Sequence, residues 1–241
     1  MPRDETRGDL VFVGDVHIDR EDADLPAFLR YLESLPARAR RIVLMGDLFN
    51  LWVAADGLEQ PHHRAVIECL RAIRSDGTEV HYLEGNRDYR ASAHRGTTFD
   101  AVDGTGLRED WGGRRIWAAH GDLVNVNDVQ YRSWRRLSRS APFWWLFSVI
   151  PRKRRLALAL SMERSMRSTN LDMKRAFPEA LIRAYAERHV ADGSDAVVLG
   201  HFHLERELGV GRARVFVLPE WKGTRRHLRV DAQGRMAFED A

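Results

Sequence analysis

The sequence LVFVGDVH (residues 10–17) runs from an apolar, β-branched segment directly into an Asp-x-His motif. Four other segments have the same design: RIVLMGD (41–47), VHYLEGNRD (80–88), IWAAHGD (116–122) and AVVLGHFH (196–203). Each apolar run predicts a buried β-strand, so each following Asp, Asn or His stands at a strand end. In open α/β sheets, ligands bind at the carboxyl ends of the strands. We therefore expect these five strand ends to converge on one crevice.

The sequence between and after these strands predicts helices and then a helical insertion. Helical patterns at 25–35 and 63–74 alternate with the early strands, which favours an α/β fold with a parallel or mixed sheet. From about residue 128 to 186 the strand pattern stops, and amphipathic helical sequence broken by prolines replaces it. A chain of 241 residues fits one domain. We expect a single domain, 1–241, that carries a helical cap at about 125–186.

Charge is unevenly distributed along the chain. Residues 125–185 contain thirteen Lys/Arg and four Asp/Glu, a net charge of +9, whereas the whole chain carries only +3. Such a basic region can attract nucleic acid, anionic lipid or a phosphorylated substrate, and charge alone does not choose among them. Because no zinc-ribbon, RNA-recognition or P-loop pattern accompanies it, we expect no nucleic-acid partner.

Cysteine content and hydropathy indicate the cellular setting. Cys69 is the single cysteine, which excludes an intrachain disulfide, and residues 1–10 lack the apolar core of a secretory signal. The longest apolar run, 141–150, is about half of the roughly 20 residues that a membrane-spanning helix needs. We therefore expect a cytoplasmic protein that is soluble or peripheral to a membrane.

The residue types at the strand ends are those of a metal site. A single Asp-x-His or Gly-Asp motif is more often an ordinary turn, but five such motifs directly after strands favour a shared function. Carboxylate, imidazole and amide ligands together suit Mn, Fe or Zn, and Mg less well because several are histidines. The candidate metal ligands are Asp15, His17, Asp47, Asn86, His120, His201 and His203.

These ligands divide into two sites in the arrangement that we expect. Asp47 would bridge two ions, with Asp15, His17 and His203 completing one site and Asn86, His120 and His201 the other. Two ions about 3.5–4 Å apart can share an activated hydroxide and stabilise a phosphoryl group during in-line displacement. The sequence therefore predicts hydrolysis of a phosphorus ester.

The order of these motifs resembles that of the calcineurin-like metallophosphoesterases, and the resemblance covers residues 10 to about 203. That superfamily usually has histidine after the asparagine of its third motif, whereas this chain has Arg87. Arginine there is similar to the UDP-2,3-diacylglucosamine diphosphatases of lipid A synthesis. The stretch Gly46-Asp47-Leu48-Phe49 with the following Trp52, and Gly85-Asn86-Arg87-Asp88, are also similar to that family, as is the Arg152-Lys153-Arg154 stretch that enters the cap.

The resemblance implies a fold, an activity and a set of roles. The implied fold is an α/β sandwich of two mixed sheets flanked by helices, with an inserted helical cap. The implied reaction converts UDP-2,3-diacylglucosamine to UMP and 2,3-diacylglucosamine 1-phosphate with two divalent ions, Mn²⁺ first among them. Catalytic roles are implied for Asn86, Arg87 and His120, and substrate contacts for Arg87, Asp128, Tyr131, Arg167, Asn170 and Lys174. The last three lie at i, i+3 and i+7, so a helix would place them on one face.

Two departures from the family pattern keep other substrates open. The chain has Asn125-Val126-Asn127-Asp128 where the family usually has Cys-Thr-Asp-Asp, and Leu204-Glu205 follows its last motif. Neither change removes a ligand. The alternatives are a phosphodiesterase or phosphatase acting on another nucleotide-linked lipid or a soluble phosphoester, and a membrane-associated scaffold without turnover.

The start of the cap joins aromatic residues to basic ones. The run APFWWLFSVI (141–150) is followed by Pro151 and a basic cluster, residues 152–155. These apolar side chains would either pack the cap onto the body or enter the headgroup region of a membrane, and both can hold at once. Side chains that could line a channel for acyl chains are Trp144, Leu146, Phe147, Leu156 and Leu160. The expected partners are a nucleotide-linked glycolipid and the anionic inner face of the cell inner membrane, with no protein partner.

Overall fold

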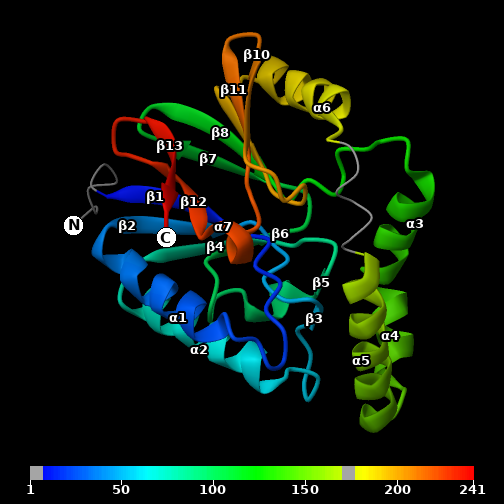
Figure 1. The fold of residues 1–241 in the computed structure, drawn as a ribbon. Helices are drawn as coiled ribbons and strands as arrows, with labels where there is room; N and C mark the ends of the chain where they lie inside the picture. The colour runs from blue at the N-terminus through cyan, green and yellow to red at the C-terminus, as the bar shows by residue number, and fades with distance from the viewer. Residues whose placement is uncertain (1–7, 170–176) are drawn as a thin grey trace.

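Two β-sheets packed face to face form the centre of the molecule. The computed structural model describes residues 8–169 and 177–241, apart from the side chains of residues 163–169. Helices cover the outer faces of both sheets, and a group of helices projects at one end (Figure 1). The prediction of an α/β sandwich of two mixed sheets flanked by helices is confirmed.

The first sheet has six strands in the order β13-β12-β1-β2-β4-β6. Strands β1, β2, β4 and β6 are parallel. Strand β12 pairs antiparallel with β1, and β13 pairs antiparallel with β12. The bounds are β1 Asp9–Val13, β2 Ala39–Leu44, β4 Glu79–Leu83, β6 Ala101–Asp103, β12 Arg226–Val230 and β13 Met236–Asp240. Helices α1 (Leu25–Ser34) and α2 (Pro61–Ser75) cover its outer face (Figure 1).

The second sheet has five strands in the order β10-β11-β9-β8-β7. Its three central strands, β8, β9 and β11, are parallel, and each edge strand pairs antiparallel with its neighbour. The bounds are β7 Leu107–Trp111, β8 Arg114–Ala119, β9 Ala196–Leu199, β10 Arg206–Val210 and β11 Ala213–Val217. Helix α6 (Glu179–Ala191) packs on this sheet through Ile182 and Tyr185.

Side-chain alternation along β1 shows how the sheets are layered. Leu10 and Phe12 point into the core between the two sheets, where they meet Val198 and Phe216. Val11 belongs instead to the core beneath α1 and α2. Because successive side chains of a strand point to opposite faces, the apolar run Leu10 to Val13 of β1 is buried on both sides. Its carboxyl end is therefore held in the middle of the fold.

The remaining elements outside the cap are short. They are β3 (Trp52–Val53) and β5 (Asp88–Tyr89), which pair in parallel, the 3-10 turns η1 (Leu35–Ala37) and η2 (Ala91–His94), and the short helix α7 (Trp221–Thr224). Strand β5 begins inside the Gly-Asn-Arg-Asp motif, so it holds that motif against the segment that follows Asp47.

Three helices project from the body as the cap: α3 (Val129–Ser138), α4 (Ala141–Ser148) and α5 (Arg152–Thr169) (Figure 1). Asp128 caps α3 by accepting a hydrogen bond from the backbone N–H of Tyr131, and Ser140 caps α4 in the same way. The cap packs on the body through Trp144, Phe147 and Leu156, which contact an apolar cluster of Leu51, Val53, Leu58 and Tyr89. The limits of the cap and the single-domain organisation stay a prediction.

Candidate metal centre

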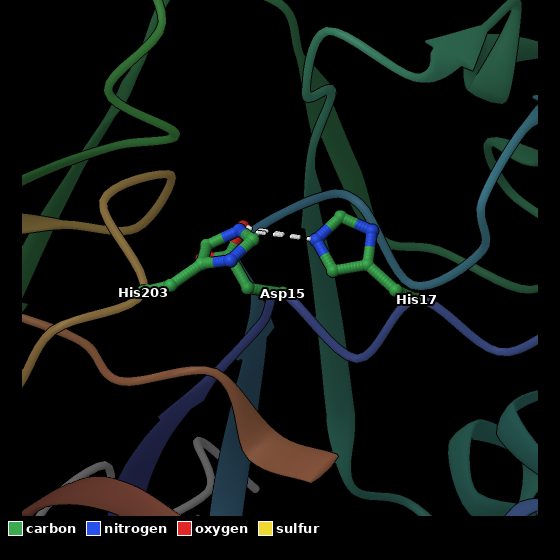
Figure 2. A group of neighbouring side chains, drawn as sticks. All are labelled: Asp15, His17 and His203. Carbon is green, nitrogen blue, oxygen red and sulfur yellow. Dashed lines mark hydrogen bonds and ion pairs between the residues drawn. The ribbon is translucent and has the colours of Figure 1, made fainter. Parts of the chain in front are cut away.

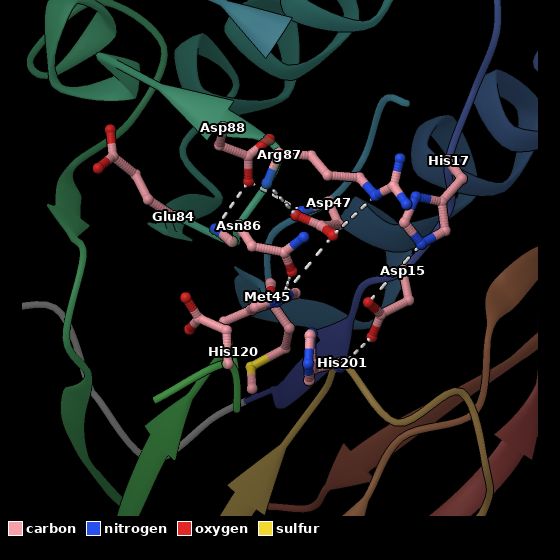
Figure 3. Close-up of polar contacts among 12 residues, drawn as sticks. Asp15, His17, Met45, Asp47, Glu84, Asn86, Arg87, Asp88, His120 and His201 are labelled. Carbon is pink, nitrogen blue, oxygen red and sulfur yellow. Dashed lines mark hydrogen bonds and ion pairs between the residues drawn. The ribbon is translucent and has the colours of Figure 1, made fainter. Parts of the chain in front are cut away.

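The five predicted strand ends lie together in the structure. Strands β1, β2, β4, β8 and β9 each end beside the same pocket, where their Asp, Asn and His side chains face one another (Figure 3). Two overlapping groups of ligand atoms form here, in each of which all atoms lie within 4.8 Å of one another. Asp15 belongs to both groups.

The first group consists of Asp15, His17 and His203 (Figure 2). The Nε2 atoms of His17 and His203 lie 3.1 Å apart, and Asp15 Oδ1 lies 3.9 Å from the first and 3.5 Å from the second. All three side chains are buried or nearly so. Two imidazole nitrogens and a carboxylate oxygen thus point at one small volume.

The second group consists of Asp15, Asp47 and His120. His120 Nε2 lies 3.7 Å from Asp47 Oδ2 and 3.1 Å from Asn86 Oδ1. The other ring nitrogen, Nδ1, lies 2.7 Å from the carbonyl oxygen of Met45, which fixes the ring orientation. The structure thus places Asp15 in both groups and Asp47 in one, and the bridging role of Asp47 stays a prediction.

His201 lies beside both groups. Its backbone N–H donates to Asp15 Oδ2 at 2.7 Å, its ring centroid lies 5.1 Å from that of His120, and it lines the pocket. The seven residues predicted as metal ligands are therefore neighbours in the structure.

Unusual backbone conformations fix these side chains. Asp15, His17, Asp47, His201 and His203 all have φ between 50° and 72°, the left-handed region that non-glycine residues rarely adopt. Residues held in such conformations cost about 1–3 kcal/mol each and persist only where the surrounding structure determines them. Their concentration at one point indicates that the backbone here is shaped for the side chains it presents.

Two glycines make room for the carboxylates. A Cβ atom added at Gly85 would lie 2.1 Å from Asp47 Oδ1, and one at Gly200 would lie 2.7 Å from Asp15 Oδ2. Both distances are far below van der Waals contact, so the Gly-Asn and Gly-His steps of the motifs place the backbone directly against the ligands.

The ionisation of Asp15 and of two of the histidines fits divalent cations. Burial lowers the pKa of His17 well below its ordinary value, and burial together with the charge of His120 lowers the pKa of His201 to about 4. Both rings are therefore neutral near pH 7 and have a lone pair to donate. Burial opposes the charge of Asp15, but its interaction with His203 outweighs burial and keeps the pKa of Asp15 below the usual range.

Buried polar atoms without a hydrogen-bond partner support the same conclusion. Asp15 Oδ1 and His17 Nδ1 are buried, and neither has a hydrogen-bond partner. A buried carboxylate oxygen without a partner carries a large desolvation cost, which a cation would remove. The donor set of carboxylate, imidazole and amide suits borderline divalent metals.

Asp88, which the sequence did not mark as a site residue, holds two of the motifs together. Its Oδ2 atom accepts hydrogen bonds from the backbone N–H groups of Asp47 and Gly85, both at 2.8 Å. Burial and the nearby charge of Asp47 raise the pKa of Asp88. The presence of Asp88 in the Gly-Asn-Arg-Asp motif was the available signal, but the contact joins residues 41 positions apart.

Arg87, predicted as catalytic and substrate-binding, lies against the second ligand group (Figure 3). Its Nε lies 3.5 Å from Asp47 Oδ2, its backbone N–H donates to Asp47 Oδ1 at 3.0 Å, and Nη1 donates to the carbonyl oxygen of Asn50. The side chain is only 5% exposed yet lines the pocket. Its positive charge is thus fixed beside the place where the two groups meet.

Asp128 and Tyr131, predicted to contact substrate, form one wall of the pocket. The Tyr131 hydroxyl donates to Asp122, and Arg135 Nε forms an ion pair with the same carboxylate at 3.0 Å. Arg135 also donates to the carbonyl oxygens of Glu84 and Gly104. This connection, which the sequence did not reveal, ties α3 to the strand ends that carry His120 and Asn86.

The other predicted substrate contacts are Arg167, Asn170 and Lys174. Arg167 is in α5, within the stretch whose side chains are not described, and Asn170 and Lys174 lie outside the described residues. Their contacts with substrate stay a prediction.

The pocket above the ligands has a volume of about 380 Å³. Besides the ligands it is lined by the polar residues Arg87, Asp122 and Asn125 and by the apolar residues Leu181 and Phe202. A cavity of this size with a few convergent polar groups is typical of a small-molecule site.

Comparison with known proteins places these features in a family. The family model for calcineurin-like phosphoesterases matches residues 9–205. A UDP-2,3-diacylglucosamine hydrolase of Aeromonas salmonicida (strain A449) is 29% identical over 222 residues, covering 88% of this chain and 85% of the relative. One of Pseudomonas putida (strain KT2440) is 28% identical over 240 residues, covering 93% and 96%.

Solved structures share the fold at low identity. A novel archaeal phosphodiesterase aligns over 96% of this chain and 98% of its own with a TM-score of 0.52 and 11% identity. A hypothetical protein of Pyrococcus horikoshii OT3 aligns over 97% of this chain and 87% of its own with a TM-score of 0.53 and 14% identity. At these identities the likeness concerns the fold alone.

Proposed function

The chain belongs to the calcineurin-like phosphoesterase family, and on that premise we propose that it hydrolyses the diphosphate of UDP-2,3-diacylglucosamine. The products are UMP and 2,3-diacylglucosamine 1-phosphate. Metal-dependent hydrolysis of a phosphoester follows from the family and from the ligand groups at the strand ends. The identity of the substrate is supported by relatives that match nearly the whole chain and are named UDP-2,3-diacylglucosamine hydrolase.

Two divalent ions, Mn²⁺ in this proposal, are held by the seven predicted ligands. Bound there, they supply positive charge that stabilises the phosphoryl oxygens and activates water for in-line attack. The observation that carries the proposal is that Asp15 is shared between two ligand groups in one pocket. Shared carboxylates of this kind suit a pair of ions.

Arg87 and His120 act on the diphosphate itself. The Arg87 guanidinium is fixed beside Asp47 at the pocket wall, so its charge is available to the developing phosphoryl oxygens without reorganisation. Burial opposes protonation of His120, but the charges of Asp47 and Asp15 raise its pKa. Asn86 positions the group by placing its Oδ1 against the His120 ring.

The polar lining of the pocket binds the sugar and nucleotide in this proposal. Tyr131 and Asp128 are part of this lining, and the Asp122 carboxylate holds the Tyr131 hydroxyl in a fixed direction. Arg167, Asn170 and Lys174 complete the substrate contacts in this proposal.

The cap brings the protein to the surface of the membrane that contains the substrate. Trp145, Leu146 and Val149 are all at least 60% exposed. The basic residues 152–155 follow directly. Exposed aromatic and aliphatic groups beside basic ones suit the headgroup region of an anionic membrane. Within the described residues no helix has the length and hydropathy to cross a bilayer. We place the protein on the inner face of the cell inner membrane.

UMP release from purified protein in detergent tests the proposal. The assay compares UDP-2,3-diacylglucosamine with an unacylated UDP-sugar, each with Mn²⁺ and with EDTA. We expect metal-dependent release from the acylated substrate alone. Metal-dependent cleavage of only a generic phosphodiester would favour a soluble phosphoester or another nucleotide-linked lipid as substrate. No hydrolysis in any arm would favour a scaffold without turnover.

A further inference from the structure

The segment that follows β11 runs beneath the first ligand group. Trp221 anchors it, because this side chain is 1% exposed and its ring packs edge-on against Phe28 at 4.9 Å between ring centroids. The guanidinium of Arg225 lies over the other side of the same ring. The residues on either side of Trp221 are thus held in place, and they lie beyond the residues that the family model matches.

Three consecutive residues of this segment each contact a different member of the Asp15, His17 and His203 group. Glu220 Oε2 lies 3.6 Å from His203 Nδ1. The backbone N–H of Trp221 donates to the carbonyl oxygen of Asp15 at 3.3 Å. The ammonium of Lys222 donates to the carbonyl oxygen of His17 at 2.8 Å.

The contact of Glu220 orients the His203 ring. The Nε2 atom of His203 faces Asp15 and His17, so Nδ1 is the nitrogen that points away from the ligand group. Histidines that bind metals almost always donate their other ring N–H to a carboxylate or carbonyl group, which fixes the tautomer and raises ligand basicity. The Glu220 carboxylate stands where that partner is needed.

The contacts of Trp221 and Lys222 support the backbone. Asp15 and His17 have φ of 51° and 53°, and each has its carbonyl oxygen bonded by this segment. Lys222 is fixed in turn by an ion pair with Asp22, whose side chain is 7% exposed. Unfavourable backbone conformations persist where neighbours over-determine them, and these bonds do so at both residues.

We propose that Glu220, Trp221 and Lys222 form the outer support of the Asp15–His17–His203 metal site, with Glu220 as the positioning residue for His203. The inference rests on the proposed pair of ions. It assigns Glu220 and Lys222 to one ion, because His203 and His17 belong to the first group only, whereas Trp221 contacts Asp15, which belongs to both. In the second group, Asp47 and His120 are held by Asp88 and Met45.

Titration of the metal-stripped full chain with Mn²⁺ by calorimetry tests this assignment. Wild-type protein should bind two ions. In Glu220→Gln, which cannot act as the carboxylate partner, we expect one of the two ions to bind about 10–100-fold more weakly and the other to bind as before. Lys222→Met should weaken the same ion, and Lys222→Arg should restore part of the affinity because it keeps the positive charge.

Glu207→Gln is the matched control. Glu207 pairs with Arg214 on the exposed surface of β10, which β11 separates from β9, so both affinities should equal those of wild type. Two ions bound by Glu220→Gln with wild-type affinity, an equal loss at both sites, or a lower melting temperature of the metal-free variant that accounts for the loss would each overturn the proposal. If wild type binds both ions but releases no UMP, the proposed substrate is wrong, and this assignment of Glu220, Trp221 and Lys222 still stands.

Discussion

The strand-end centre and the cap meet at one pocket, but their functional groups are fixed in different ways. The ligands of the metal centre follow the ends of strands that are buried on both faces. Strained backbone conformations and hydrogen bonds hold these ligands. The cap presents its groups from helices that leave large apolar side chains exposed. The first arrangement suits chemistry that tolerates little displacement, and the second suits contact with a deformable partner such as lipid. Substitutions in the two regions should therefore differ in kind.

Loss of a shared ligand should have the largest effect. We expect Asp15→Ala to lower kcat by more than the about 10²–10³-fold that removal of one transition-state donor costs, because Asp15 belongs to both ligand groups. Asp47→Ala should abolish turnover as well, since the predicted bridge is lost. Steady-state kinetics at saturating Mn²⁺ measure both. A variant of either kind with full activity would remove the contrast between centre and cap.

Removal of the buried anchor of the cap should come next. Asp122→Ala leaves the Arg135 charge buried without its partner, so we expect the free energy of unfolding to fall by about 3–5 kcal/mol. Glu179→Ala is the control, because its i,i+4 pair with Arg183 is exposed and should contribute at most about 0.5 kcal/mol. Urea unfolding of both variants compares them. Equal losses would show that Asp122 does not anchor α3.

A methyl group added to the backbone beside Asp47 should have a smaller effect than loss of a ligand. The Cβ of Gly85→Ala would meet Asp47 Oδ1 at 2.1 Å and push the carboxylate aside. A displacement of about 1 Å can cost about 10²-fold in rate, so kcat should fall by that order. Gly209→Ala, whose added Cβ meets nothing within 4 Å, should leave kcat unchanged. Similar rates for the two variants would mean that the centre tolerates displacement.

The smallest effect is expected on the cap surface. Trp145 is 70% exposed, so Trp145→Ala should leave stability and metal binding unchanged. The binding of this variant to anionic vesicles should weaken by about tenfold. The loss is limited because the apolar area that an interfacial side chain buries in the membrane is less than that of a fully buried side chain. Sedimentation with vesicles measures the partition, and neutral vesicles serve as the comparison. Unchanged partition would place membrane contact elsewhere.

The sequence predicted the strands and the strand-end residues because both signals are local. An apolar run followed by Gly and Asp is readable within eight residues, as in residues 10–17. The short edge strands β6, β7 and β10 were not predicted, because their burial alternates with polar residues or covers few positions. The loss of the strand pattern after residue 128 predicted a helical insertion, and helices α3, α4 and α5 lie in that part of the chain.

The support around the ligands could not be predicted in the same way. Asp88 accepts from the backbone of Asp47, and Asp122 pairs with Arg135, through contacts that the folded arrangement of strands creates. Glu220 lies 17 positions after His203, and no spacing rule connects them. Such partners act on backbone groups or second ring nitrogens, so residue type alone does not reveal them.

We propose that the strand-end ligands hold the divalent ions that hydrolysis of the diphosphate of a lipid-linked nucleotide requires. The most direct measurement is UMP release from UDP-2,3-diacylglucosamine by wild type and Asp15→Ala, after removal of metal with EDTA and after Mn²⁺ is restored. We expect wild type to lose activity with EDTA and regain it with Mn²⁺, and the variant to stay inactive in both conditions. UMP release by wild type without metal, or by Asp15→Ala after Mn²⁺ is restored, would contradict the proposed function.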